Sequence, residues 1–228
     1  MTDLWEIERK HFANGIKLIC GVDEAGRGPL AGPVCAAAVI LPPELELPGL
    51  DDSKKLSDKK RRELFPLIQE KAIAYGIAFA DHEEIDRINI LQATYLAMER
   101  ALAQLAVRPQ LALIDGNRAK DFGLPVETVV HGDSLSASIA AASILAKVSR
   151  DNWMEQTARE YPQYGFEIHK AYGTKAHYAA IDAYGPSPIH RMTFLKKYYV
   201  PGHIPIQSFC VHFVPAGGSG ELSSSCAQ

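Results

Sequence analysis

Four acidic side chains lie where predicted strands end, a position at which a sheet can bring them together. Asp23 and Glu24 follow the apolar run of residues 16–22, and a glycine loop comes directly after them. Asp115 ends the apolar segment LALID, and Asp133 follows a further predicted strand in the segment HGDS. Carboxylates that converge on one sheet edge repel one another unless cations neutralise them, and hard divalent cations prefer oxygen ligands. The pattern therefore predicts a divalent-metal site.

The chemistry expected of such a site is phosphodiester cleavage. Mg²⁺ binds through one or two protein carboxylates together with waters and phosphate oxygens of a substrate. A pair of such ions about 3.5–4 Å apart stabilises both the attacking and the leaving oxygen of an in-line displacement. Two of the acids also have an ordinary explanation, because Asp115 precedes Gly116 as in many turns and Asp133 precedes Ser134 as a helix cap would. The pair Asp23 and Glu24 fits this explanation less well, because an ordinary turn needs no second adjacent acid. Asp151 lies further along the chain, and we do not assign it as a ligand.

Glu24 raises a geometric question of its own. Adjacent residues of a strand point to opposite faces of the sheet, so Asp23 and Glu24 share a site only under special conditions. The strand must bend there, or Glu24 must contribute through its backbone carbonyl. We expect Asp23 to matter more than the Glu24 carboxylate.

The glycine loop of residues 26–32, GRGPLAG, does not match the common nucleotide-binding motifs. It lacks the Gly-Lys-Ser/Thr ending of a P-loop and the third glycine of a GxGxxG fingerprint. The triplet DFG at residues 121–123 has no HRD catalytic loop to accompany it, and no HExxH zinc motif is present in the sequence. These observations argue against a P-loop NTPase, a dinucleotide-binding enzyme, a protein kinase and a zincin protease.

Hydrophobic patterning predicts the elements that must position these residues. The predicted strands cover residues 16–23, 33–41, 72–80, 111–116 and 126–130. One predicted helix starts after an N-cap at Ser57. Three further predicted helices cover residues 83–105, 135–161 and 174–184. Three strands in succession, followed by alternating strands and helices, predict an α/β fold with a mixed sheet and helices packed on it.

Composition describes a globular chain of ordinary size. Its 228 residues are 47% hydrophobic and 22% charged, and no apolar run approaches the length of a membrane span. The mixed polar start is not typical of a secretory signal, and the four cysteines form no CxxC pair. We therefore expect a cytoplasmic protein with one domain over residues 1–200 and an irregular tail over residues 201–228. The net charge of −3 means that a nucleic-acid partner must meet local basic patches.

Four segments together resemble the bacterial type 2 ribonuclease H family, ribonuclease HII. These segments are GVDEAGRGPLAGPV, LIDGN, GDSLSASIAAASILAKVSRD and HKAYGTKAHYAAIDAYGPSPIHR, and the resemblance covers roughly residues 15–195 in the family's order. The resemblance implies a ribonuclease-H-like fold, with a mixed five-stranded sheet flanked by helices and a C-terminal helical extension.

The resemblance also implies an activity. The family cuts the RNA strand of RNA–DNA hybrids and nicks duplex DNA 5′ of embedded ribonucleotides, leaving a 3′-hydroxyl and a 5′-phosphate. It uses Mg²⁺ or Mn²⁺, and a two-metal mechanism is implied. The family's catalytic acids map to Asp23, Glu24, Asp115 and Asp133, the first three being the direct metal ligands.

Substrate contacts map to two further motifs. In the family, the loop that matches Gly26, Arg27 and Gly28 places its backbone against the ribonucleotide and its 2′-hydroxyl. Tyr172 matches the tyrosine that packs on the sugar, although Ala171 stands where the family usually has glycine. Lys170 and Lys175 bracket this tyrosine. Further candidates for phosphate contacts are the segment of residues 54–62, Lys147, and the segment HRMTFLKK of residues 190–197.

Each of these residues also has a plain structural explanation. Arg27 is equally a solvated loop charge, Tyr172 a half-buried loop aromatic, and the charges of residues 54–62 a solvated helix face. Two other functions remain open: another ribonuclease-H-like nuclease of the resolvase type, and a catalytically silent hybrid-binding protein. We expect a monomer whose partners are RNA–DNA hybrids and ribonucleotide-containing DNA duplexes, with no membrane partner.

Overall fold

The computed structural model describes residues 3–51, 53, 55–196 and 198 of the chain. Its elements follow one another in the order α1 (Glu6–Ala13), β1 (Ile19–Ala25), β2 (Val34–Ile40), α2 (Asp58–Lys71), β3 (Ala74–Ala80), α3 (His82–Ala103), β4 (Leu111–Asp115), β5 (Val126–Val129), the 3₁₀ helix η1 (Gly132–Ser134), α4 (Ala137–Glu160), the 3₁₀ helix η2 (Pro162–Tyr164), α5 (Phe166–His169), α6 (Lys175–Tyr184) and α7 (Met192–Leu195).

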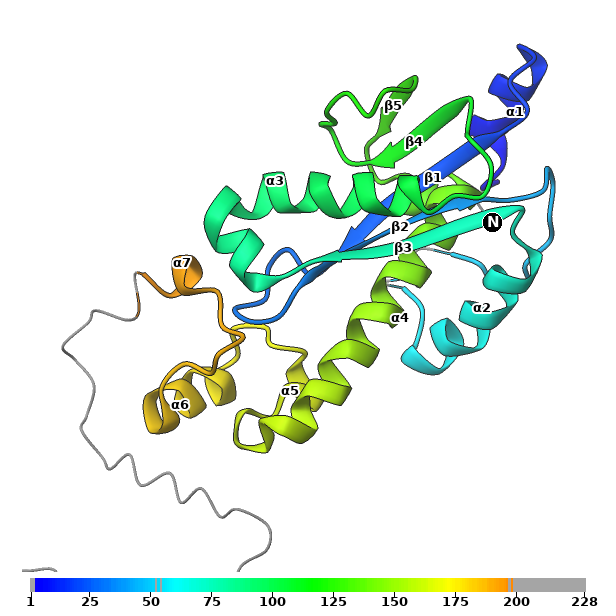
Figure 1. The fold of residues 1–228 in the computed structure, drawn as a ribbon. Helices are drawn as coiled ribbons and strands as arrows, with labels where there is room; N and C mark the ends of the chain where they lie inside the picture. Colours follow the sequence, from blue (N-terminus) through cyan, green and yellow to red (C-terminus); the bar gives the residue numbers. More distant parts are fainter. Residues whose placement is uncertain (1–2, 52, 54, 197, 199–228) are drawn as a thin grey trace, which may run out of the picture.

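The strands form one mixed sheet in the order β3-β2-β1-β4-β5 (Figure 1). β1 and β3 both run antiparallel to β2, whereas β1, β4 and β5 run parallel to one another. This arrangement confirms the predicted mixed five-stranded sheet. The chain from β2 to β3 passes through α2, the helix predicted to follow the Ser57 N-cap, so these two neighbouring antiparallel strands are joined by a helical connection.

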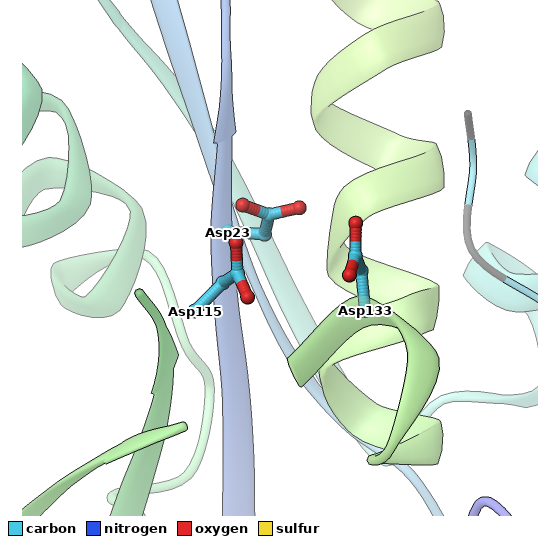
Figure 2. Close-up of side chains that lie close together, drawn as sticks. All are labelled: Asp23, Asp115 and Asp133. Carbon is cyan, nitrogen blue, oxygen red and sulfur yellow. The ribbon is translucent and has the colours of Figure 1, made fainter. Parts of the chain in front are cut away.

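The register of the parallel pair places two acids side by side. Val22 of β1 pairs with Ile114 of β4, so the next residues along the two strands, Asp23 and Asp115, lie next to each other. Figure 2 shows both carboxylates at this strand end, facing Asp133 beside the start of α4. The carboxyl ends of parallel strands thus gather the acids at one edge, as expected from their positions in the sequence.

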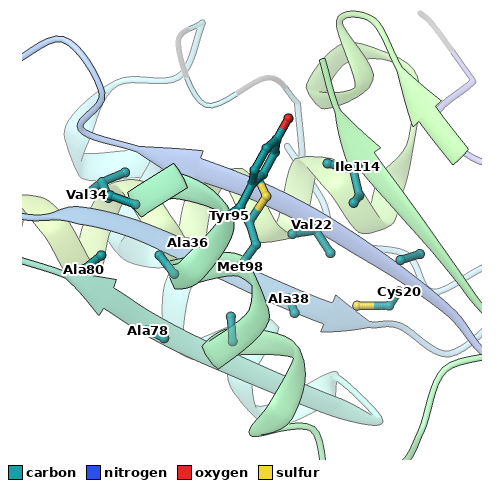
Figure 3. Close-up of a cluster of buried hydrophobic side chains, with 14 of the residues drawn as sticks. Cys20, Val22, Val34, Ala36, Ala38, Ala78, Ala80, Tyr95, Met98 and Ile114 are labelled. Carbon is teal, nitrogen blue, oxygen red and sulfur yellow. The ribbon is translucent and has the colours of Figure 1, made fainter. Parts of the chain in front are cut away.

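Alternation along the strands divides the core between two faces. Cys20, Val22 and Ala38 face α3, which contributes Tyr95 and Met98 (Figure 3). The intervening residues Cys35, Ala37 and Val39 face α2 and α4 instead. Because both faces are covered by helices, the central strands are apolar almost without interruption.

Local signals in the sequence account for most helix boundaries. The hydroxyl of Ser57 accepts a hydrogen bond from the backbone N–H of Lys60, which confirms the predicted N-cap of α2. Asp81 and Glu84 form a capping box at the start of α3. Within α3 the backbone kinks at Asn89, whose φ of 68° and ψ of 163° are not helical.

The N-terminal segment differs from the prediction. The sequence indicated a polar lead followed by a strand from residue 16, but the structure has α1 there and β1 begins only at Ile19. α1 carries Glu8, which is fully buried against the start of α4. The signal for α1 is weak because its eight residues are mostly charged and its only fully buried member is a carboxylate.

Beyond α4, the C-terminal helices form a small cluster of their own, in which Leu30 and Met154 pack against residues of α5, α6 and α7. These helices extend from the far end of α4 (Figure 1). The predicted tail, residues 201–228, lies outside the described residues. Among the helices that the structure describes, none combines the length and apolar character that a bilayer span requires.

Candidate functional site

Three carboxylates converge at the carboxyl end of the parallel strands. One oxygen atom from each of Asp23, Asp115 and Asp133 lies within 4.8 Å of the other two (Figure 2). Asp23 and Asp133 are buried, and Asp115 is half-buried. β1 and β4 supply the first two, whereas Asp133 comes from η1, immediately before α4. The structure thus brings together three of the four predicted catalytic acids.

The electrostatics of this cluster follow from burial and like charge. Burial raises the pKa of the Asp23 carboxyl well above its ordinary value, and the neighbouring carboxylates of Glu24, Asp115 and Asp133 raise this pKa further. The backbone N–H of Glu24 donates to Asp23 Oδ1 at 2.7 Å, which opposes the rise. A group of buried acids of this kind favours a proton or a metal cation.

Close backbone packing holds Asp115 and Asp133 in place. The N–H of Gly132 donates to Asp115 Oδ1 at 2.7 Å, so the turn that carries Asp133 is tied to the end of β4. On β1, a Cβ at Gly21 would lie 2.1 Å from the backbone carbon of Ser138. Only glycine therefore allows β1 to approach the first turn of α4 this closely.

Glu24 lies outside the three-carboxylate cluster. Its Oε1 accepts from Arg27 Nη1 at 3.2 Å, and its side chain is 14% exposed. Glu24 nevertheless lines the same pocket as Asp23 and Asp115. The expectation that consecutive strand residues diverge agrees with this arrangement, and a role for Glu24 as a ligand stays a prediction.

A pocket of about 260 Å³ joins the acids to the glycine loop. Its lining includes the acids Asp23, Glu24 and Asp115, together with the segment of residues 26–28 and Tyr172. Lys147 and Arg61 also line it. The motifs singled out in the sequence therefore share one cavity, although they come from distant parts of the chain.

Two buried arginines hold the glycine loop. The Arg191 guanidinium donates to the carbonyls of Gly26 at 2.7 Å, Arg27 at 3.0 Å and Gly32 at 2.8 Å. Burial and the neighbouring charge of Arg150 lower the pKa of Arg191 to about 9. The sequence placed Arg191 among the phosphate-contact candidates, and that prediction is wrong, because the side chain is fully buried and turned toward the main chain.

Arg150 connects the glycine loop to the Tyr172 segment. It donates to the carbonyls of Ala31 at 3.3 Å, Pro33 at 3.1 Å and Lys170 at 3.1 Å, and a Cβ at Gly26 would meet its side chain at 2.0 Å. The sequence analysis missed Arg150. A signal existed, because this arginine falls in the buried stripe of α4 between Val148 and Met154.

Tyr172 follows two residues with left-handed backbone. Lys170 and Ala171 have φ angles of 48° and 64°, in the left-handed region. Alanine adopts this conformation under strain, whereas the glycine that the family usually has at position 171 would adopt it readily. The Ala171 carbonyl accepts from Leu30 N–H at 2.8 Å. The Tyr172 ring is exposed and lies beside Gly28, where a Cβ would be 3.6 Å from the ring.

The other basic candidates occupy varied surroundings. Lys170 Nζ lies 2.8 Å from Glu155, and Lys147 Nζ lies 2.7 Å from Asp151, which is itself buried. Lys175 is exposed at the start of α6. His190 is 1% exposed and is therefore unsuited to contact phosphate. Lys54 and Lys197 lie outside the described residues, and the remaining phosphate contacts stay predictions.

The donor set at the cluster fits a hard divalent cation. All three side chains offer carboxylate oxygens, the ligand type that Mg²⁺ and Mn²⁺ take in proteins. Two oxygens bound to one Mg²⁺ lie at most about 4.2 Å apart, so the spacing within 4.8 Å is close to what a shared ion requires. A bound cation would also relieve the repulsion that raises the pKa of Asp23.

Comparisons with known proteins agree with this architecture. The family model described as Ribonuclease HII matches residues 20–197. The chain is 59% identical over 179 residues to ribonuclease HII of Dechloromonas aromatica, an alignment that covers 78% of this chain and 91% of the relative. Ribonuclease HII of Geobacter metallireducens is 56% identical over 200 residues, or 87% and 94% of the two chains.

Solved structures show the same fold. The crystal structure of ribonuclease H2 from Pyrococcus horikoshii has a TM-score of 0.65 at 27% identity, and the match covers 77% of this chain and 93% of that one. A ribonuclease HIII structure in complex with Mn²⁺ has a TM-score of 0.58 at 23% identity, covering 74% and 63%. The ribonuclease-H-like fold is thus confirmed, and the chain belongs to the ribonuclease HII family.

Proposed function

We propose that this ribonuclease hydrolyses the RNA strand of RNA–DNA hybrids and nicks duplex DNA on the 5′ side of embedded ribonucleotides. The products would be a 3′-hydroxyl and a 5′-phosphate, and the reaction would require Mg²⁺ or Mn²⁺. One observation supports this most strongly. The clustered acids Asp23 and Asp115 and the ribose-contact candidates, the segment of residues 26–28 and Tyr172, line the same pocket.

The acids would act as the metal ligands. Asp23, Asp115 and Asp133 would hold a divalent cation, with Glu24 at the edge of the same pocket. When bound, the cation supplies Lewis-acid activation of water and stabilises the negative charge of the leaving oxygen. The cluster binds the cation only when its carboxyls are ionised, so burial of Asp23 makes metal binding compete with protons.

The glycine loop would select ribose by close contact. Glycines at positions 26 and 28 let the main chain approach a sugar, and the 2′-hydroxyl is the group that distinguishes RNA from DNA. Arg27 is half-exposed beside Glu24 and would contact a phosphate next to the scissile bond. The exposed Tyr172 ring, which lies beside Gly28, would pack on the same sugar.

We also infer that the protein acts as a monomer in the cytoplasm. Cys20 and Cys35 are free, buried thiols, as is usual in a reducing compartment.

A duplex that contains one ribonucleotide tests this proposal. With Mg²⁺ or Mn²⁺, we expect a single cut on the 5′ side of the ribonucleotide, and with EDTA we expect none. End-group analysis of the product should find a 3′-hydroxyl and a 5′-phosphate. The matched substrate is an all-DNA duplex of the same sequence, which should remain intact.

Each rival function has a distinct outcome in this assay. If the all-DNA duplex were cut as fast as the ribonucleotide-containing duplex, the proposal of ribose selection would be wrong. Binding of the hybrid without cleavage in either metal would indicate a silent hybrid-binding protein. Cleavage confined to branched DNA, tested in parallel, would indicate a resolvase-type nuclease.

A further inference from the structure

Two buried histidines lie behind the Tyr172 segment. We propose that His177 and His190 are positioning residues, which form a directed hydrogen-bond chain that holds Tyr172 for ribose recognition. The inference rests on the proposed function, because it concerns how that function selects its substrate. His177 belongs to α6 and His190 to the segment that leads into α7, so the chain links two C-terminal elements to the pocket.

The backbone of Ser187 sets the direction of the chain. Its N–H donates to His190 Nδ1 at 2.8 Å, and a backbone N–H can only donate. The Ser187 hydroxyl lies 2.7 Å from the same nitrogen. His190 Nδ1 must therefore carry a lone pair, and the proton of a neutral His190 ring must be on Nε2.

The remaining protons follow from this first assignment. His190 Nε2 lies 3.0 Å from His177 Nε2, so the N–H of His190 makes His177 Nε2 the acceptor. The proton of His177 is then on Nδ1, which lies 3.0 Å from the carbonyl oxygen of Tyr172. Each contact thus has one donor and one acceptor only when both rings are neutral and take these two different tautomers.

The surroundings favour neutral rings. His177 is fully buried and His190 is 1% exposed. His169 stacks on the His177 ring with the centroids 4.7 Å apart, and the Phe166 ring packs edge-on at 5.4 Å. Burial and the neighbouring histidine lower the pKa of His190 to about 4, and burial also lowers the pKa of His177. The chain is therefore intact over the pH range in which nucleases work.

Tyr172 is the residue on which the chain ends. Its carbonyl accepts from His177 and also from the backbone N–H of Thr174 at 2.8 Å. The two preceding residues hold left-handed backbone angles, a conformation that costs energy and needs external support. While His177 holds the main chain of this segment, the Tyr172 ring remains exposed beside Gly28. The position of the Tyr172 ring therefore depends on the Nδ1–H group of His177, which does not contact the substrate.

A double-mutant cycle tests the inference. His177→Phe keeps an aromatic ring but removes the donor, and we expect kcat on the single-ribonucleotide duplex to fall roughly ten- to a hundredfold. In the Tyr172→Ala background the same substitution should change kcat by less than about twofold, because the group that it positions is already absent. Equal losses in the two backgrounds would overturn the proposal, as would an unchanged kcat in the single variant.

A conservative substitution supplies the matched control. The amide nitrogen of His177→Asn occupies a place near that of Nδ1 and can donate to the Tyr172 carbonyl, although His190 Nε2 loses its acceptor, so kcat should fall clearly less than in His177→Phe. A loss as large as that of His177→Phe, in a variant shown by circular dichroism to be folded, contradicts a positioning role. If His177→Phe does not fold, the smaller His177→Leu takes its place in the cycle.

The tautomers give a readout that is independent of activity. Two-dimensional ¹⁵N–¹H spectra of the wild-type protein at pH 7 should show a protonated Nδ1 on His177 and a protonated Nε2 on His190. A His177 ring protonated on Nε2 would overturn the proposal. Failure of the wild type to cut the ribonucleotide duplex would instead contradict the proposed function, so the two failures are distinguishable.

Discussion

The Asp23 carboxyl is 6% exposed and stands beside the carboxylates of Asp115 and Asp133. Burial and like charge raise its pKa, so the ionised side chain opposes folding unless a cation is bound. A single residue thus couples pH, metal binding and stability. The coupling has a definite sign, because a raised carboxyl pKa means that the folded state retains a proton that the unfolded chain has released.

We expect Asp23→Asn to stabilise the metal-free protein at neutral pH. In the wild type the free energy of unfolding should fall as pH rises from about 4, the ordinary pKa of an aspartate, through the raised pKa of the folded state. The variant should lack this part of the pH dependence. Urea unfolding in EDTA across a pH series measures the difference, and identical profiles for the two proteins would contradict it.

Glu24→Gln tests the neighbouring residue. The Glu24 carboxylate lies outside the three-acid cluster and pairs with Arg27, so its loss should reduce kcat less than Asp23→Asn does. We expect at least a hundredfold loss for Asp23→Asn, the size typical when a group that stabilises the transition state is removed. Comparable losses in the two variants under the same Mg²⁺ titration would show that both carboxylates act as ligands.

At the scale of elements, α1 fastens the start of α4. Glu8 Oε1 accepts from the Ser136 hydroxyl at 2.6 Å and from the Ser138 N–H at 3.0 Å, and the Leu4 carbonyl accepts from the Ala137 N–H at 2.8 Å. The negative charge is also favourably placed at a helix N-terminus. Because η1 and its Asp133 precede this turn, α1 helps to hold the three-carboxylate cluster in place.

Glu8→Ala should lower the free energy of unfolding by about 1–3 kcal/mol, since it leaves the Ser138 N–H and the Ser136 hydroxyl buried without their acceptor. The matched control on the same helix is Glu6→Ala. Glu6 makes an exposed pair with Lys10, which contributes at most about 0.5 kcal/mol. Denaturant unfolding compares the two, and equal effects would argue against a structural role for Glu8.

The whole molecule carries a net charge of −3, so its overall field does not attract nucleic acid. On the proposed function, binding would depend on basic side chains that line the pocket, among them Arg27, Lys147 and Arg61. The affinity should therefore fall steeply as salt releases the condensed counterions of the duplex.

Arg27→Ala should reduce the slope of log affinity against log salt by about 1, because one phosphate contact is lost. Arg108→Ala is the control, since Arg108 binds the Gly123 carbonyl beside a different pocket and should leave the slope unchanged. Fluorescence anisotropy with an inactive Asp23→Asn background measures both slopes on an RNA–DNA hybrid. An unchanged slope in Arg27→Ala would place Arg27 outside the phosphate contacts.

Much of this molecule could be predicted from local patterns. The strand and helix periods, the Ser57 cap and the acids at strand ends are all properties of short segments. Most were found where they were expected, but β1 begins three residues later than predicted and Glu24 lies outside the three-carboxylate cluster. The motifs also sufficed to indicate the family. The helix α1 escaped prediction, because the residue that it buries is a glutamate whose partners lie in α4.

Only the tertiary structure decided which residues act together. It turned Arg191 inward to the glycine loop. It also set His190 against His177, at the back of the Tyr172 segment. The partners in these contacts are separated in the sequence. Their residue types, arginine and histidine, are also common on protein surfaces, so residue type alone does not reveal that they are buried. Residue types therefore determined which chemistry was available, whereas burial and the register of distant strands decided which side chains lie together to carry it.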